Sequence, residues 1–300
     1  MRAQARLVLL FVLGVALFSA MDAAMKELVA VRGHPALAAT FWRYVAALPV
    51  ILLFWWRAGR PAVRASGLPL HILRGAVIAA SAVLFFRALA VLPLAEAVAL
   101  AFVAPLMIPP LAALLLRERL APASLAAGSA GFLGVAVATG LDPAEIPSER
   151  RLGIAAVLAS AFLYALAIVL TRRLAPRDGP SVVSLLGGVV PALVLLPPLL
   201  LTVPGPARLP PAGDAGLVLA AGLLGAVALQ LIARAFAQAE AQRLAPFEYT
   251  ALLWAALFGF ALFSEPLTGR TAAGAAIIAA ACLWQVRRAA AAPAPSLPVA

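Results

Sequence analysis

Charge, cysteine, histidine and lysine are all scarce in this sequence, and each shortage excludes a class of protein. Only 12% of the residues are charged, against about 25% in a typical soluble domain. The single cysteine, Cys282, allows neither an internal disulfide nor a cysteine-based metal site. The two histidines, His34 and His71, cannot form a multi-histidine metal cage. The only lysine, Lys26, lies outside any Gly-x-x-x-x-Gly-Lys phosphate-binding loop, so we expect no ATP use, no metal and no cofactor.

Apolar residues dominate what remains and place the chain in a membrane. They make up 65% of the sequence, and the mean hydropathy is +1.05. A soluble protein of this size cannot bury so much apolar surface and keep a wettable exterior. A helix needs about 20 apolar residues to cross about 30 Å of hydrocarbon. The sequence offers ten such runs, near residues 7–28, 35–56, 72–91, 95–116, 122–140, 151–171, 180–202, 215–237, 245–263 and 270–286. We therefore expect an all-α integral membrane protein with ten transmembrane helices.

Two short patterns occur twice at the same separation. Arg87-Ala88-Leu89-Ala90 is repeated as Arg234-Ala235-Phe236-Ala237, and Glu118-Arg119-Leu120 as Glu265-Pro266-Leu267. Both separations are 147 residues (234 − 87 and 265 − 118). Because five helices per copy is an odd number, the second copy must start from the opposite side of the membrane. We therefore expect two inverted five-helix repeats, an arrangement typical of alternating-access transporters.

These repeats divide the chain into four segments. We assign residues 1–140 to the first repeat, 141–150 to an outer linker, 151–288 to the second repeat and 289–300 to a disordered cytoplasmic tail. The linker is rich in proline and acidic residues, whereas the tail is rich in alanine and proline and carries no charge. One chain holds both repeats, so a monomer is sufficient for transport, although the sequence leaves the oligomeric state open.

Basic residues are distributed unevenly between the two sides of the predicted helices. With the N-terminus inside, fourteen fall in cytoplasmic segments, Arg74 among them, and five fall in outer segments: Arg32, Arg150, Arg151, Arg208 and Arg270. This bias follows the positive-inside rule and predicts an inner-membrane protein with both termini in the cytoplasm. It also accounts for the net charge of +11. The charge therefore indicates a lipid bilayer as the partner and gives no support for nucleic-acid binding.

The helices and motifs together resemble a known family. The family pattern is ten helices in two inverted halves, with an arginine early in the second helix (Phe41-Trp42-Arg43-Tyr44) and Glu-x-Leu closing the fourth and ninth. It is that of the drug/metabolite transporter superfamily, and within it the chain is similar to EamA-type transporters, which include the YddG-like exporters of amino acids. The resemblance covers about residues 5–288 and implies a secondary transporter, not an enzyme. Its implied role is the export of small amphipathic metabolites, amino acids foremost, by alternating access. No basic residue stands at the position of the second half that matches Arg43.

Two alternatives stay open at this point. A multidrug or nucleobase exporter would need a more hydrophobic cavity with an essential buried acid, for which Glu248 is the candidate. An intramembrane enzyme or lipid-handling protein has less support, because the sequence offers neither catalytic metal ligands nor a recognisable nucleophile–base pair.

Charged residues inside the predicted helices are candidates for function, because a charge in hydrocarbon is costly unless it is paired or hydrated. Asp22 and Arg43 are expected to pair between the first two helices, as a structural clamp or as an outer gate. Arg234 and Glu248 are expected near the inner ends of the eighth and ninth helices, as an ion pair or in gating or substrate binding. Arg87, the repeat counterpart of Arg234, is expected near the outer end of the third helix.

Polar and aromatic residues inside the spans form a second group of candidates. An amphipathic solute needs hydrogen-bonding groups for its head and an apolar or aromatic wall for its side chain. Trp254 lies near mid-helix, away from the interfacial belt where tryptophan collects, and ordinary packing is its alternative role. The predicted substrate-binding residues are Ser81, Phe85, Tyr164, Gln230, Tyr249 and Trp254.

Two further patterns indicate structural roles. Glu118 and Glu265 each precede a short break, so we expect them to accept hydrogen bonds from backbone donors at the next helix start. Gly128, Gly131 and Gly134 give the fifth helix a smooth stripe that suits close helix packing.

Overall fold

Every regular element in the part of the chain that the structure describes is a helix. The computed structural model describes residues 2–117, 122–139, 146–238, 247–248 and 250–291. The long helices are α1 (Arg2–Lys26), α2 (Ala36–Arg57), α3 (Leu68–Leu89), α4 (Leu94–Ala101), α5 (Ala104–Leu116), α6 (Pro122–Thr139), α7 (Ser148–Asp178), α8 (Pro180–Thr202), α10 (Ala215–Gln238), α12 (Thr250–Phe263) and α13 (Gly269–Ala291). Short turns of helix lie between them, at η1 (Glu27–Val31), η2 (Ala65–Gly67), α9 (Gly205–Arg208) and η4 (Ala212–Asp214).

These helices match the ten predicted membrane spans. Seven described helical stretches are long and apolar enough to cross a membrane, and three shorter apolar helices lie at Leu125–Ala138, Thr250–Phe263 and Gly269–Trp284. The fourth span consists of α4 and α5, which are interrupted just before Pro105. A proline there lacks the N–H that a continuous helix would need. The prediction of an all-α multi-pass membrane protein with ten helices is confirmed.

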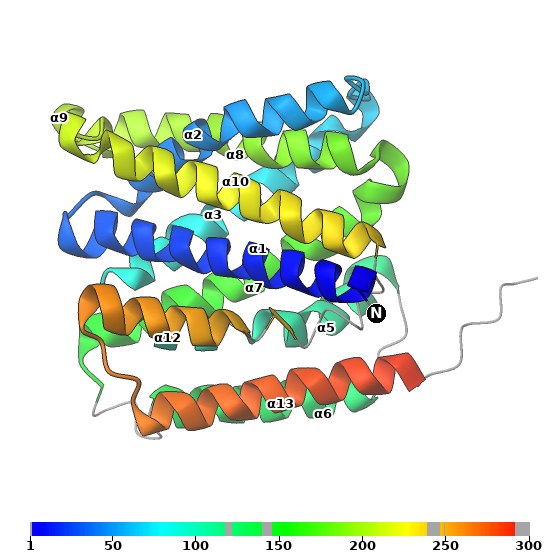
Figure 1. The fold of residues 1–300 in the computed structure, drawn as a ribbon, viewed down its shortest axis with the longest axis vertical. Helices are drawn as coiled ribbons and strands as arrows, with labels where there is room; N and C mark the ends of the chain where they lie inside the picture. Colours follow the sequence, from blue (N-terminus) through cyan, green and yellow to red (C-terminus); the bar gives the residue numbers. More distant parts are fainter. Residues whose placement is uncertain (1, 118–121, 140–145, 239–246, 249, 292–300) are drawn as a thin grey trace, which may run out of the picture.

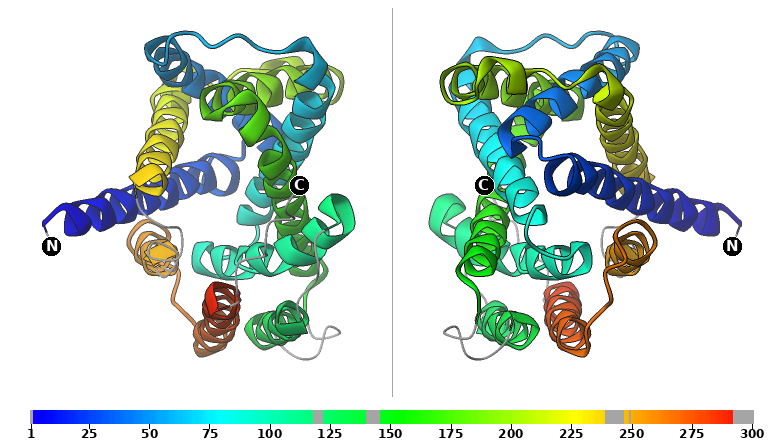
Figure 2. Two further views of the ribbon diagram at one scale, coloured as in Figure 1. Left: turned by 90° about the vertical axis from the view of Figure 1, so that its right-hand side faces the viewer. Right: turned by 90° about the vertical axis from the view of Figure 1, so that its left-hand side faces the viewer.

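The helices lie side by side and give the bundle two ends (Figure 1). One end holds the start of α1, the start of α3 and the ends of α7 and α13, and we call it the His71 end (right in Figure 1). The opposite end holds the end of α1 and the starts of α4, α7 and α10, and we call it the Lys26 end. The two views in Figure 2 look onto these ends in turn.

The helix boundaries repeat at the separation seen in the sequence. The starts of α3 and α10 are 147 residues apart (215 − 68), as are the starts of α6 and α13 (269 − 122) and the ends of α5 and α12 (263 − 116). α1 ends at the Lys26 end whereas its counterpart α7 begins there, so the two copies run in opposite directions (Figure 1). Residue 140 of the first repeat, residues 141–145 of the predicted linker and 292–300 of the predicted tail lie outside the described residues, and α13 continues to Ala291.

The two halves are interleaved rather than set side by side. In the first half, α1 packs on α10 and α12 of the second half. In the second half, α7 packs on α3, α4 and α5 of the first half, which are the counterparts of α10 and α12. The main apolar core accordingly draws residues from both halves, including Met25, Leu100 and Ile278. Opening either end of the bundle therefore requires movement between the halves.

The packing of α6 against α13 depends on glycine. A Cβ atom added to Gly274 of α13 would lie 2.5 Å from the Gly134 carbonyl oxygen and 2.7 Å from the Ala138 nitrogen of α6. A Cβ added to Gly131 would overlap Leu106, whereas one added to Gly128 would meet nothing within 4 Å. The predicted glycine stripe thus makes close contacts at two of its three positions.

Candidate functional site

Lys26, the only lysine of the chain, forms a buried ion pair with the other half at the Lys26 end. Its Nζ lies 2.6 Å from Oε1 of Glu265, and the two side chains are 6% and 19% exposed. The same ammonium donates to the carbonyl oxygens of Leu92, at 2.5 Å, and Leu89, at 3.2 Å. Sequence reasoning missed this role, although a lone lysine near the end of an apolar span was a signal for it.

Glu265 also bonds to the backbone of the first half. Its Oε2 accepts the N–H of Leu94, in the first turn of α4, at 2.8 Å. The sequence predicted that Glu265 would satisfy a helix-start donor. It does so at α4 of the other half rather than at the helix that follows it in the chain. Glu118, the counterpart, lies outside the described residues. Glu96 and Arg150 add a further ion pair between the halves at this end, at 2.9 Å.

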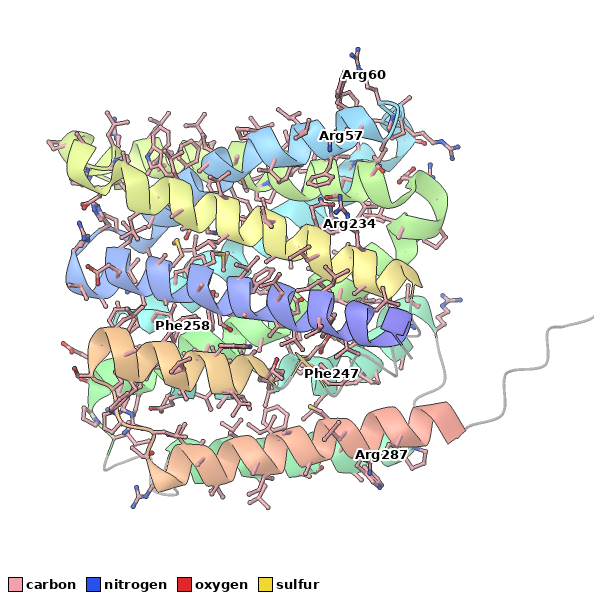
Figure 3. The ribbon with its side chains drawn as sticks, in the orientation of Figure 1. Arg57, Arg60, Arg234, Phe247, Phe258 and Arg287 are labelled. Carbon is pink, nitrogen blue, oxygen red and sulfur yellow. The ribbon has the colours of Figure 1, made fainter. Side chains whose placement is uncertain are left out.

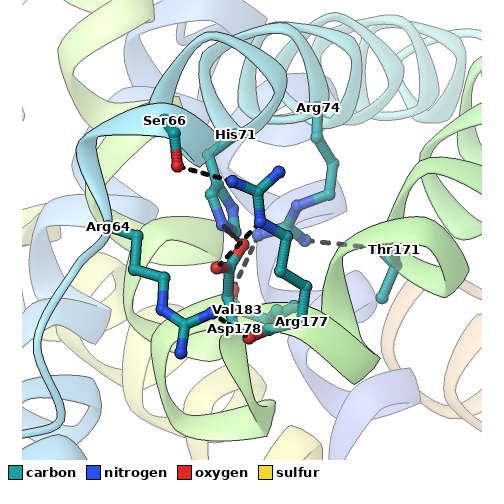
Figure 4. Close-up of polar contacts among 8 residues, drawn as sticks. All are labelled: Arg64, Ser66, His71, Arg74, Thr171, Arg177, Asp178 and Val183. Atoms are coloured by element: carbon teal, nitrogen blue, oxygen red, sulfur yellow. Dashed lines mark hydrogen bonds and ion pairs between the residues drawn. The ribbon is translucent and has the colours of Figure 1, made fainter.

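Each of the two histidines bonds to an aspartate of the other half. At the Lys26 end, His34 Nε2 lies 2.7 Å from Asp214 Oδ2. At the His71 end, His71 Nε2 lies 3.1 Å from Asp178 Oδ2, and these side chains are only 1% and 2% exposed (Figure 4). The sequence had suggested only that the histidines exclude a metal cage, because their partners are remote in sequence.

The charge around these two pairs differs. Arg32 forms a direct ion pair with Asp214 beside His34. The His34 hydrogen bond, together with the Arg32 guanidinium, holds the pKa of Asp214, which precedes the spanning helix α10, below its ordinary value. Asp178 has no such close cation, because the nearest Arg177 nitrogen is 4.0 Å from its Oδ1.

The two pairs occupy equivalent places with acid and base exchanged. His34 follows α1 and η1, and Asp178 ends α7, which is their counterpart. Asp214 precedes α10, and His71 lies in the first turn of α3, the counterpart of α10. Gly67 stands 147 residues before Asp214 (214 − 67), and a Cβ there would lie 3.0 Å from Asp178 Oδ2. The same junction between halves is thus bonded at both ends of the bundle.

The predicted ion pair between Asp22 and Arg43 is not formed in this structure. The Arg43 guanidinium instead lies over the rings of Tyr44, at 4.1 Å, and Phe86, at 5.4 Å. Its nearest other partner is the Met21 sulfur, 3.6 Å from a terminal nitrogen. Arg43 is thus stabilised by aromatic faces, which can hold a buried guanidinium. A gating role for Asp22 and Arg43 stays a prediction.

Arg74 supplies a further buried cation. The sequence placed it among the cytoplasmic basic residues, and the structure places it inside α3, where it is 4% exposed and donates to the Val183 carbonyl of α8 at 2.6 Å (Figure 4). A Cβ on Gly187 of α8 would come within 3.2 Å of its guanidinium, just as a Cβ on Gly225 of α10 would approach Arg43 at 3.4 Å. Both arginines belong to the first half and both glycines to the second. Because α2 and α8, and α3 and α10, are counterparts, the two contacts join equivalent pairs of helices.

The remaining predicted charged residues lie on α3, on α10 and just before α12. Arg234 lies over the Phe54 ring of α2 at 5.1 Å, and Figure 3 shows it above α1, whereas Phe247 lies below α1. A role of Arg234 and Glu248 as an ion pair or in gating or substrate binding stays a prediction. Arg87 is exposed in the last turn of α3.

Ser81 holds helices together instead of facing a cavity. Its hydroxyl donates to the Ser160 carbonyl at 3.0 Å, and the Ser160 hydroxyl donates to the Ser81 carbonyl at 2.8 Å. These reciprocal bonds join α3 to α7, and Ser81 is 6% exposed. The polar character of Ser81 was recognised from sequence, but its partner across the repeat was not. A substrate-binding role for Ser81 stays a prediction and would require these bonds to open.

The other predicted binding residues that the structure describes are distributed over four helices, α3, α7, α10 and α12. Tyr164 of α7 is 52% exposed and lies within electrostatic range of Glu248. The Trp254 ring stacks on Phe258 of α12 with centroids 6.4 Å apart, and its indole nitrogen has no hydrogen-bond partner among the described residues. Three further candidates complete the set: Phe85 lies edge-on to Phe86, Gln230 is partly buried in α10, and Tyr249 lies outside the described residues. Tyr164, Glu248 and Trp254 stay candidate transport residues.

Comparison with known proteins agrees with the duplicated architecture. The pattern of the EamA-like transporter family matches residues 5–140 and again residues 151–287. The chain belongs to the EamA-like transporter family. A solved crystal structure covers 95% of this chain and 99% of its own, with a TM-score of 0.63 and 21% identity, which supports the fold alone.

Several proteins that are similar in sequence to this EamA-family chain are named as transporters of particular small molecules. A riboflavin transporter of Rhizobium johnstonii is 31% identical over 90% of this chain and 87% of its own length. A pseudopaline exporter of Pseudomonas aeruginosa is 30% identical over 92% of this chain and 94% of its own. An S-adenosylmethionine uptake transporter of Rickettsia felis is 26% identical over 81% and 80%. The family and these relatives are transporters of small molecules.

Proposed function

We propose that this EamA-family chain is a secondary transporter that moves a small amphipathic metabolite by alternating access between its two halves. The observation that carries the proposal is the pairing of His34 with Asp214 and of Asp178 with His71. Equivalent contacts between the halves stand at opposite ends of the bundle. Breaking one while keeping the other exposes one end at a time, as alternating access requires.

The solute is the finer part of the proposal. The sequence resemblance implied amino acids, whereas the relatives are named for riboflavin, pseudopaline and S-adenosylmethionine. The stacked rings of Trp254 and Phe258 favour a solute with a flat ring, and the indole nitrogen of Trp254, which has no partner among the described residues, favours one that also carries polar groups. Riboflavin is therefore the first solute to test, with amino acids second. The relatives include an exporter and an uptake transporter, so we infer export only from the sequence resemblance.

The orientation is also proposed. We place the His71 end, which holds the start of α1 and the end of α13, in the cytoplasm of a cell with an inner membrane, because the basic residues favour that side. The two halves, residues 1–140 and 151–288, work within one chain. A reporter fused after residue 300 checks the orientation, and labelling from the outside of intact cells would contradict it.

Counterflow in proteoliposomes tests the function. Vesicles loaded with unlabelled riboflavin, an amino-acid mixture, S-adenosylmethionine or a nucleobase are diluted into the labelled solute, and saturable exchange identifies the substrate. Trp254→Ala should lower exchange at least about tenfold, because it removes the stacked wall. Phe260→Ala is the matched control on the same helix, since its side chain is 69% exposed. Exchange of nucleobases or lipophilic cations alone would support the alternative exporter, and no exchange of any solute would contradict the proposal.

A further inference from the structure

A pocket of about 500 Å³ opens at the His71 end between the start of α3 and the end of α7. Ser66, Gly67, Leu70 and Leu73 line one side, and Arg173 and Arg177 line the other. None of the predicted transport residues contributes to it. The pocket is therefore separate from the candidate transport residues.

The polar side of this pocket is positively charged. Arg173 and Arg177 are four residues apart on α7, which places them on one face of the helix. Arg177 donates to the Ser66 hydroxyl, and Arg64 donates to the Arg177 carbonyl at 3.2 Å (Figure 4). Asp178 lies behind Gly67, where its Oδ2 is bonded to His71. Two guanidinium groups therefore line the pocket, and the Arg64 guanidinium bonds to the backbone of one of them.

The start of α3 already faces an anion. The N–H groups of a helix start favour a negative charge, and a Cβ on its N-cap, Gly67, would lie 3.0 Å from Asp178 Oδ2. A ligand anion in the pocket would therefore bind through the arginines rather than through the helix start.

The other side of the pocket is apolar and continues along the bundle surface. Leu70 and Leu73 line the cavity, and Leu73 is 51% exposed. Leu68 and Ile72, on the same first turns of α3, are 38% and 46% exposed. A ligand in this pocket would therefore have its charge beside Arg173 and Arg177 and its apolar part along α3. Basic pockets of this kind at the ends of membrane helices bind anionic lipid head groups.

We propose that this pocket binds the phosphate group of an anionic phospholipid, with the acyl chains lying against Leu73 and Ile72. The bound lipid joins the start of α3 to the end of α7, which belong to different halves. It thereby stabilises the bonded arrangement of the His71 end. The proposal is independent of which solute is transported.

Lipid binding to the purified full chain tests it. Native mass spectrometry is combined with thermal unfolding in detergent after addition of phosphatidylglycerol, cardiolipin, phosphatidylcholine or inorganic phosphate. We expect retained adducts and a rise of a few degrees in the unfolding temperature with the two anionic lipids only. The double substitution Arg173→Gln and Arg177→Gln should weaken that binding at least about tenfold, because it removes two charge-assisted phosphate contacts.

The matched control is the double substitution Arg57→Gln and Arg60→Gln, which removes two exposed arginines at the same end but outside the pocket. Equal losses in both double variants would mean non-specific attraction and would overturn the site. An equal rise in the unfolding temperature with inorganic phosphate would contradict lipid binding and would indicate a soluble phosphate compound as the ligand. If the pocket variant does not fold, hydrogen exchange on the wild-type chain still decides. Anionic lipid should protect residues 64–74 and 170–178, and no protection there contradicts the proposal.

Discussion

Lys26 and Glu265, which belong to opposite halves of the chain, form an ion pair that also bonds both ends of the α3–α4 connection. The ammonium lies 2.6 Å from the carboxylate and donates to the carbonyl oxygens of Leu89 and Leu92, while the carboxylate accepts the Leu94 N–H. A buried charge that loses its partner is costly, by about 3–5 kcal/mol. The closed state of the Lys26 end therefore depends on this pair.

Glu265→Gln should destabilise this closed state by about 3–5 kcal/mol, because it leaves Lys26 buried beside a neutral amide. The expected result is a lower thermal unfolding temperature and faster labelling of a cysteine placed near Leu92. Cys282, the only native cysteine, is replaced first. Glu149→Gln is the control, since Glu149 is exposed at the start of α7. Equal effects of the two substitutions would show that the pair does not hold the end closed.

Arg43→Lys should lower stability although it keeps the charge. The planar guanidinium lies over Tyr44 and Phe86, and an ammonium cannot stack in the same way. We expect a loss of about 0.5–2 kcal/mol in the free energy of unfolding, measured by chemical denaturation. Arg60→Lys, at an exposed arginine over Trp56, is the control and should change little.

Asp22→Asn, Arg43→Gln and the double variant test the clamp that the sequence predicted between Asp22 and Arg43. A direct pair would make each single substitution more harmful than the double one. Because no direct pair is formed here, we expect the double variant to lose more free energy of unfolding than either single variant. A double variant more stable than either single variant would restore the clamp.

The sequence was sufficient for the span boundaries and the duplication but not for the bonds between halves. Apolar runs and a constant offset are local or one-dimensional properties, and α3 and α10 begin where the offset requires. The partners of Ser81 and His71 lie on α7, 79 and 107 residues away. Such pairs depend on how the halves interleave, which no local pattern encodes. Polar residues that looked available for a solute, Ser81 above all, were therefore already bonded.

Arg43 and Arg74 illustrate the same limit. An alignment of the halves offers no basic residue opposite Arg43, which suggested a role performed only once. In the structure, Arg74 provides the second cation from the counterpart of the helix that Arg43 contacts. The two arginines are equivalent in the helices that they contact but not in their positions along the chain. The offset of 147 residues therefore does not relate one to the other.

The contribution of Asp214 to the free energy of unfolding should depend on pH only under acidic conditions. His34 and Arg32 lower the pKa of Asp214 in the folded state. The stabilisation is therefore fully present above the unfolded pKa, about 3.9, and is lost as the pH falls through the lowered folded value. Wild type and Asp214→Asn should differ in unfolding temperature by a constant amount from pH 7 to pH 5 and converge below about pH 4. A gap that closes between pH 7 and pH 5 would contradict this assignment.

Gly274→Ala and Gly128→Ala should change stability in opposite directions, although both replace a helical glycine. At Gly274 the new methyl group would lie 2.5 Å from the Gly134 carbonyl oxygen and 2.7 Å from the Ala138 nitrogen. These are backbone atoms, so α6 and α13 must move apart, at a cost of about 1–3 kcal/mol. At Gly128 nothing lies within 4 Å, and alanine should gain up to about 1 kcal/mol of helix propensity. Thermal unfolding of the two variants in the same detergent measures both signs. A stabilised Gly274→Ala would mean that α6 and α13 do not pack this closely.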